Sequence, residues 1–181
     1  MAITYLNGDA TKPTLSKGET GLLVHVCNDV GGFGKGFVLA LSNRWPYPER
    51  EYRRWHREGQ DLLAGKFQLG AIQVVPVQGD PPLSVVNMIA QEGYGKGNRN
   101  RHRSSEPDSR PPIRYDALEQ CLTEVGYLVK SGPAQGASIH MPRIGCGLAG
   151  GKWGDVEPII ERTLSHAQVT VYDPPGGKFN P

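Results

Sequence analysis

The chain has 181 residues and a mass of 19.7 kDa, which suits one compact domain. Its 20 lysines and arginines against 18 aspartates and glutamates give a net charge of +2, too balanced to indicate nucleic-acid or membrane binding. No apolar run approaches the ~18 residues of a membrane span and no charged-then-apolar leader opens the chain, so we expect neither a span nor a signal peptide. The three cysteines fit no metal-binding spacing and indicate a reducing compartment, so we expect a cytoplasmic protein without a metal site.

Apolar runs of strand length alternate along the chain with segments of helical period. The dense apolar run at 21–27 is typical of a strand buried on both faces of a sheet. Strands that alternate with helices predict an α/β protein, a three-layer α/β/α sandwich with a mixed central sheet. We expect strands at 3–6, 21–27, 71–77, 83–90, 137–141 and 168–173, and helices at 37–43, 49–59, 113–130 and 155–166.

Two glycine-rich loops each follow a predicted strand and precede a predicted helix, one at 28–36 (NDVGGFGKG) and one at 142–151 (PRIGCGLAGG). Such loops present backbone N–H groups and the positive end of a helix dipole to an anion, and glycine permits close approach of phosphate oxygens. Phe33 and Leu148, which we expect to be exposed, distinguish these loops from plain turns. The sequence therefore predicts a ligand with a diphosphate centre, held by one loop on each side.

Two familiar phosphate motifs do not explain these loops. Gly34-Lys35 is followed by Gly36, so the hydroxyl residue that completes a P-loop is missing. Residues 145–150 match GxGxxG, but only one predicted strand follows them, so a nicotinamide dehydrogenase is not expected.

Residues 92–112 form a long polar segment rich in glycine, asparagine, serine and proline. The segment is locally basic, with five lysines and arginines against three acidic residues. It is either a solvated insertion or a flap that contacts phosphate, and its basic part at 96–110 leaves nucleic acid open as a partner.

Three motifs resemble those of the macro domain family, the ADP-ribose-binding module. They are NGDAT at 7–11, the loop at 26–36, and MPRIGCGL at 141–148, and the resemblance extends over about residues 3 to 173. The branch that it indicates contains terminal ADP-ribose protein glycohydrolase and the macro domain antitoxin that removes ADP-ribose from DNA. The resemblance implies a single macro domain at 1–173, followed by a disordered tail at 174–181.

The resemblance also implies a role for each part of the site. Asp9 would accept a hydrogen bond from the adenine amino group, and the N–H of Ala10 would contact the ring. Asn28 would face the distal ribose, whereas Tyr172 would either line the adenine pocket or pack in the core. The implied ADP-ribose-binding residues are Asp9, Ala10, Asn28, Gly32, Phe33, Gly34, Gly36, Ile144, Gly145, Cys146, Gly147, Leu148 and Tyr172.

The catalytic side chains known in the family are not found in this sequence. Gln91 stands where a lysine closes the central strand in the glycohydrolase branch, and glutamine cannot form a Schiff base. Ala149 stands where that branch has an aspartate, and Lys35 where a further class has an acidic residue. Cys146 is not expected to act as a nucleophile, because no histidine has an evident position to pair with it.

Three functions remain open, and all of them would use ADP-ribose as a ligand. The first, which we favour, is a hydrolase that removes mono-ADP-ribose from acidic side chains of proteins and needs no cofactor. In this reaction a water held between the ligand's diphosphate and Asn28 or Gln91 would attack the anomeric carbon. The second is a reader of mono-ADP-ribosylated proteins without turnover. The third is an ADP-ribose 1″-phosphate phosphatase or a DNA ADP-ribosyl hydrolase.

Overall fold

The structure is a computed structural model, and it describes residues 3–94, 110–177 and 181. Most of the basic segment predicted at 96–110 and residues 178–180 of the predicted disordered tail lie outside the described residues. Among the described residues, no helix is long and apolar enough to cross a membrane.

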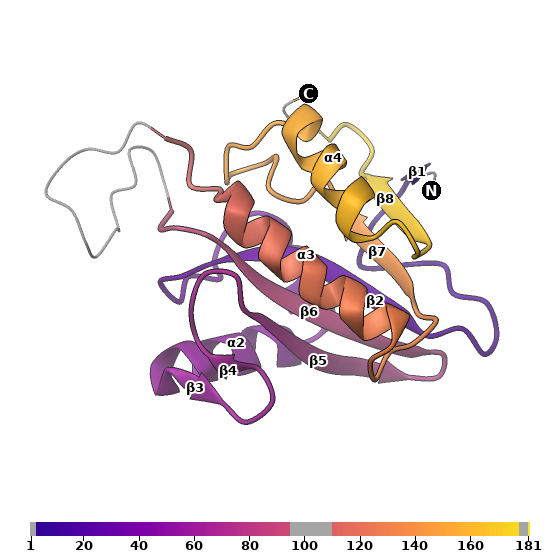
Figure 1. Ribbon diagram of the computed structural model, residues 1–181, viewed down its shortest axis with the longest axis horizontal. Helices are drawn as coiled ribbons and strands as arrows, with labels where there is room; N and C mark the ends of the chain where they lie inside the picture. The colour runs from indigo at the N-terminus through magenta and orange to yellow at the C-terminus, as the bar shows by residue number, and fades with distance from the viewer. Residues whose placement is uncertain (1–2, 95–109, 178–180) are drawn as a thin grey trace, which may run out of the picture.

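A mixed sheet of six strands forms the centre of the molecule (Figure 1). Its strands are β1 (Thr4–Asn7), β2 (Gly21–Asn28), β5 (Ile72–Gly79), β6 (Pro82–Gln91), β7 (Ser138–Pro142) and β8 (Val169–Asp173). They lie in the order β1-β8-β7-β2-β6-β5, and all neighbours are parallel except the β5–β6 pair. β2 lies in the interior of the sheet and is buried along almost its whole length, as its apolar run predicts.

Helices cover both faces of this sheet, with α3 and α4 in front of it in the view of Figure 1. The helices are α1 (Phe37–Arg44), α2 (Tyr47–Glu58), α3 (Tyr115–Lys130) and α4 (Trp153–Thr163). Successive side chains of β2 point to opposite faces, so Leu22 packs in the cluster with α3 and α4, and Leu23 in the cluster with α1 and α2. These three layers confirm the predicted α/β/α sandwich with a mixed central sheet.

The predicted element bounds differ from the observed ones at several points. α2 begins two residues earlier than predicted, because Pro48 is tolerated in the first turn, where its missing N–H is not needed. α3 begins at Tyr115 rather than at 113, because Ile113 pairs with Gln91 in an isolated bridge. A short hairpin of β3 (Gln60–Asp61) and β4 (Gly65–Lys66) was not predicted, since two-residue strands carry no detectable pattern.

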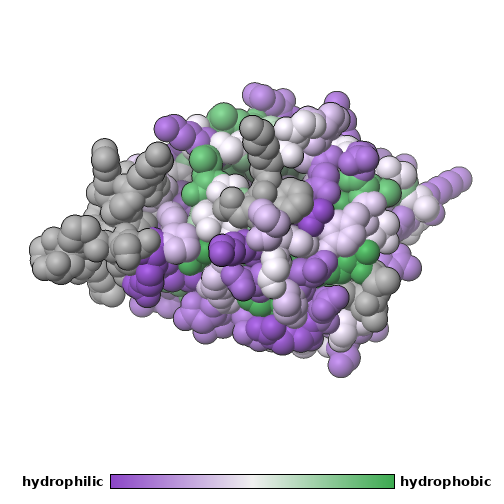
Figure 2. Space-filling model, turned by 90° about the horizontal axis from the view of Figure 1, so that it is seen from above, coloured by the Kyte–Doolittle hydropathy of each residue, from purple (hydrophilic) through white to green (hydrophobic). Residues whose placement is uncertain are grey.

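The carboxyl ends of β2, β6 and β7 meet at one edge of the sheet, because these three neighbours are parallel. Asn28 at the end of β2 is in register with Gln91 at the end of β6. The two glycine-rich loops follow β2 and β7, so the topology itself brings them to this edge. On the face shown in Figure 2, hydrophilic surface predominates and hydrophobic residues form small separate areas among the described residues.

Candidate functional site

The glycine-rich loops at 28–36, which we call loop 1, and 142–151, which we call loop 2, contact each other at the carboxyl edge of the sheet. Leu148 of loop 2 reaches Gly36 of loop 1, where a Cβ would lie 3.2 Å from Cδ1 of Leu148. Gly36 has a φ of 79° directly before α1, a conformation that favours glycine. Leu148 is 66% exposed, as predicted. The structure therefore brings the two predicted anion-binding loops together.

Loop 2 presents a run of unused backbone donors. The N–H groups of Gly147, Leu148 and Ala149 donate to no acceptor in the part of the chain that the structure describes. The N–H groups of the flanking Cys146 and Gly150 are bonded within the loop. A Cβ on Gly147 would meet no described residue within 4 Å, so these donors border space that the described residues leave open. Consecutive unpaired N–H groups beside open space are an arrangement that binds anions.

The remaining predicted residues of loop 2 anchor it. Ile144 and Cys146 are buried, and Gly145 has a φ of 73°, which favours glycine. Burial raises the pKa of the Cys146 thiol to about 11, so the thiol is protonated at neutral pH and is a poor nucleophile.

Arg143, the residue of loop 2 that directly follows β7, lies in a cluster of side chains that the sequence did not predict. The guanidinium of Arg143 makes two hydrogen bonds of 2.7 Å to Asp173 at the end of β8. It also stacks over the rings of Tyr5 and Trp153, at 4.6 and 4.7 Å from the two ring centroids. These residues come from four separate parts of the chain, so no local sequence pattern could have revealed the cluster.

Asn28 organises loop 1. Its Oδ1 accepts hydrogen bonds from the N–H groups of Val30 and Gly32, both at 3.0 Å, and its Nδ2 donates to the carbonyl of Gly32 at 2.7 Å. The buried hydroxyl of Tyr52 on α2 donates to the carbonyl oxygen and to Oδ1 of Asn28. The amide predicted to face a ribose and a water is thus engaged chiefly in shaping its own loop, with one Nδ2 hydrogen left over.

Phe33 differs from its prediction. Its side chain is 2% exposed rather than exposed, and it packs against the rings of His25 and Tyr52. The glycines on either side explain the difference, because Gly32 and Gly34 keep the backbone at the surface while Phe33 inserts into the core. Phe33 can therefore contribute its backbone, and not its ring, to a ligand. A Cβ on Gly34 would meet none of residues 3–94, 110–177 and 181 within 4 Å, so loop 1 also borders space that these residues leave open.

Gln91 lies beside loop 1 and is half-buried. Its Nε2 donates to the carbonyl of Gly93 at 2.8 Å, and its backbone carbonyl accepts from the N–H of Asp29 at 2.9 Å. Asp29, which sequence reasoning missed, in turn accepts from the N–H of Gly93 at 2.8 Å. The Oε1 atom of Gln91 accepts no hydrogen bond from any described residue, so it is the free acceptor at this end of the site.

Of the residues predicted to bind adenine, Asp9 and Ala10 follow β1, and Tyr172 lies on the neighbouring strand β8. Asp9 is exposed, and its Oδ1 accepts hydrogen bonds from the backbone N–H and hydroxyl of Thr11. Ala10 and Tyr172 are buried in the same cluster. The hydroxyl of Tyr172 lies 2.9 Å from Nδ1 of His140, and the ring is 4% exposed.

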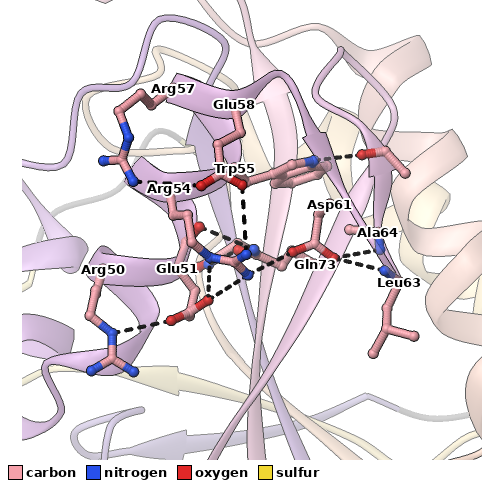
Figure 3. A network of polar contacts seen from close by, with 12 residues as sticks. Arg50, Glu51, Arg54, Trp55, Arg57, Glu58, Asp61, Leu63, Ala64 and Gln73 are labelled. Carbon is pink, nitrogen blue, oxygen red and sulfur yellow. Dashed lines mark hydrogen bonds and ion pairs between the residues drawn. The ribbon is translucent and has the colours of Figure 1, made fainter.

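A large hollow among the described residues lies elsewhere. It has a volume of about 1150 Å³ and runs along the edge strand β5, and no residue of loop 1 or loop 2 lines it. A network of ion pairs forms one wall (Figure 3), in which Arg54 contacts Glu51 and Asp61 at 2.7 and 3.0 Å. Asp61 also accepts the N–H of Leu63, so the network stabilises the β3–β4 hairpin. Its charged groups bind each other, so the two loops, and not this hollow, are taken as the candidate functional site.

Within residues 3–94, 110–177 and 181, no group of three or more His, Cys, Asp or Glu side chains could hold a metal ion. His25, on β2, is buried and bonded to Asn87 at 2.6 Å, and burial lowers its pKa to about 4.

Comparison with known proteins identifies the fold and the family, although no family model matches the chain. A macrodomain protein from Streptomyces coelicolor is 43% identical, covers 95% of this chain and 99% of its own, and superposes with a TM-score of 0.72. A protein of unknown function from Bacteroides thetaiotaomicron is 47% identical, with 96% and 98% of the two chains covered and a TM-score of 0.79. The chain belongs to the macrodomain family.

Among three curated relatives of the chain, two carry names that refer to ADP-ribose. The ADP-ribose 1″-phosphate phosphatase of Lodderomyces elongisporus is 21% identical over 95% of this chain and 98% of its own length. The DNA ADP-ribosyl glycohydrolase of Mycobacterium bovis is 24% identical over 97% of this chain, which spans 43% of that protein. The mouse Chromodomain-helicase-DNA-binding protein 1-like is 28% identical over 94% of this chain, which spans 17% of that protein.

Proposed function

We propose that the chain binds ADP-ribose between loop 1 and loop 2 and hydrolyses mono-ADP-ribose from acidic side chains of proteins. The observation that carries this proposal is the contact of two glycine-rich loops beside three consecutive unused N–H groups of loop 2. A diphosphate is a doubly charged anion of the size that such paired loops can enclose. The names of the curated relatives support the same ligand.

The order of the strands supports one orientation of the ligand. Asp9 follows β1, loop 2 follows β7, loop 1 follows β2, and Gln91 ends β6, and these strands lie in that order across the sheet. An extended ligand along this edge would place adenine at Asp9, the diphosphate between the loops, and the distal ribose near Gln91. Ala10 and the exposed backbone of loop 1 border the same line.

The proposed reaction is attack of water on the anomeric carbon of the distal ribose. The C–O bond to the modified carboxyl breaks, the carboxylate leaves, and the proton lost by water passes to solvent. A carboxylate is a good leaving group, so little general acid help is needed. Gln91 Oε1 would accept one hydrogen of the water and the ligand's own diphosphate would accept the other, so the rate enhancement comes from positioning. Asn28 would act by holding loop 1 and through its remaining N–H.

A reader without turnover is the second candidate function, and one observation favours it. The residues at the catalytic positions of the resembled branch are neutral, because Gln91 and Ala149 stand where lysine and aspartate are expected. A phosphatase and a DNA-directed hydrolase remain alternatives, supported by the relatives' names and, for DNA, by the basic segment at 96–110.

Turnover on a defined substrate tests the proposal. A protein carrying mono-ADP-ribose on glutamate esters is incubated with the chain, and free ADP-ribose is measured. We expect release with the wild-type chain and at least a ~10-fold slower release with Gln91→Ala, because the acceptor for the water is lost. Binding of ADP-ribose without release would establish the reader, and no binding would refute the proposal.

We also propose a partner, a domain range and a cellular location for the chain. Mono-ADP-ribosylated proteins are the proposed partners, and residues 1–173 are proposed to form one functional domain. A cytoplasmic location is supported by Cys27, Cys121 and Cys146, which are all free and buried.

A further inference from the structure

Two short stems flank the segment that lies outside the described residues, the first stem at 91–94 and the second stem at 111–114. The stems are joined by backbone pairing, since the N–H of Glu92 donates to the carbonyl of Pro112 at 2.9 Å. Both stems lie at the carboxyl edge of the sheet, where the first continues β6 and the second leads into α3 (Figure 1).

A largely buried ion pair between Glu92 of the first stem and Arg114 of the second also joins the stems. Nε of Arg114 donates to Oε2 of Glu92 at 2.8 Å, and the two side chains are only 11% and 19% exposed. The same guanidinium donates to the carbonyl of Pro111 at 2.6 Å. This geometry differs from that of a solvent-exposed ion pair, because both charged groups are held and largely removed from water.

The first stem is attached to loop 1. The N–H of Gly93 donates to Oδ1 of Asp29 at 2.8 Å. The ring of Tyr94 lies over Gly32, where a Cβ would be 3.1 Å from Cε1 of the ring.

The second stem is attached to loop 2. The N–H of Ile113 donates to the carbonyl of Ala149 at 3.0 Å. The side chains of the second stem also pack closely against two glycines of loop 2. A Cβ added to Gly145 would lie 2.9 Å from Ile113, and one added to Gly150 would lie 2.9 Å from Pro111. A continuous chain of contacts thus runs from loop 1 through the Glu92–Arg114 pair to loop 2.

We propose that Glu92 and Arg114 are positioning residues that set the separation of the two glycine-rich loops. The pair acts through Gly93 on loop 1 and through Ile113 on loop 2. This inference rests on the proposed ADP-ribose site. A ligand that spans both loops depends on their separation, whereas one that reaches only Asp9 and loop 2 does not.

The test measures binding of ADP-ribose, which would span both loops, and of AMP, which would not, to variants of Glu92 and Arg114. Glu92→Gln keeps the shape of the side chain and removes its charge, and Arg114→Lys keeps the charge and removes the second donor. Calorimetric titration with ADP-ribose, and with AMP in competition, is combined with hydrogen exchange of loop 1 and loop 2 under saturating ADP-ribose. We expect ADP-ribose affinity to fall at least tenfold in both variants and AMP affinity to change less than twofold. Ligand-induced protection should be lost in loop 1 and kept in loop 2.

The matched control is Glu119→Gln, which breaks the 2.6 Å ion pair with Arg162 between α3 and α4. It should change neither affinity, and thermal melting confirms that each variant is folded. Equal loss of ADP-ribose and AMP affinity, or unchanged ADP-ribose affinity, would overturn the positioning role while the proposed function stands. Absence of ADP-ribose binding by the wild-type chain would overturn both.

Discussion

Gly147→Ala separates the role of loop 2 in ligand binding from its role in stability. No described residue requires glycine here, because an added Cβ would meet none of them within 4 Å and φ lies outside the left-handed region. The alanine variant should therefore be stabilised by about 0.4–1 kcal/mol through the lower entropy of its unfolded state. For a chain of 181 residues this raises the melting temperature by about 1–4 °C.

Binding should change in the opposite direction. The new methyl group would occupy the space beside the unused N–H groups of Leu148 and Ala149, where the diphosphate must approach. We expect the Kd for ADP-ribose to rise at least ~10-fold, which corresponds to ~1.4 kcal/mol.

Calorimetric titration and thermal melting on the same preparation give both quantities. Gly79→Ala is the matched control, because a Cβ there also meets nothing within 4 Å and the turn lies at the opposite end of β5 from the loops. The control should bind ADP-ribose as the wild type does. Undiminished affinity of Gly147→Ala would refute the placement of the diphosphate at loop 2.

Three further predictions concern the framework of the site. Arg143→Met removes two charge-assisted hydrogen bonds to Asp173 and two ring contacts, so we expect a loss of about 3 kcal/mol in chemical denaturation, and a loss below ~1 kcal/mol would contradict this. Burial lowers the pKa of His25 from 6.5 to about 4, so between these pH values the unfolded chain is protonated and the folded chain is not. The contribution of neutral His25 to the free energy of unfolding is therefore fully present above pH 6.5, and about 3 kcal/mol of it is lost on acidification to pH 4. His25→Gln should flatten this part of the curve of stability against pH, and an unchanged curve would contradict the role of His25. Asp9→Ala should weaken ADP-ribose binding by ~1–3 kcal/mol in the same titration, and equal affinity would refute the adenine placement.

The layers of the fold could be predicted because strands and helices leave local patterns. The apolar run at 21–27 and the helical spacing after Tyr115 each report which faces are buried, and both elements are found close to their predicted places. The β3–β4 hairpin could not be predicted, since its form depends on Asp61 and on contacts with α2 rather than on its own two-residue strands.

Of the candidate site, the two glycine-rich loops could be predicted, because they leave a local sequence motif. Glycine spacing identified both loops, but exposure of Phe33 was inferred wrongly, because the same spacing allows a ring to turn into the core. The clusters around Arg143 and Glu92 join residues far apart in the sequence, so their partners became visible only in three dimensions. Long-range pairs of this kind explain why sequence patterns could not predict the residues that support the two loops.

The most direct test of the account is titration of ADP-ribose into the purified chain, followed on the same sample by a release assay with ester-linked mono-ADP-ribosylated protein. We expect saturable binding with one ligand per chain and release of free ADP-ribose. Absence of binding would contradict the account at its centre.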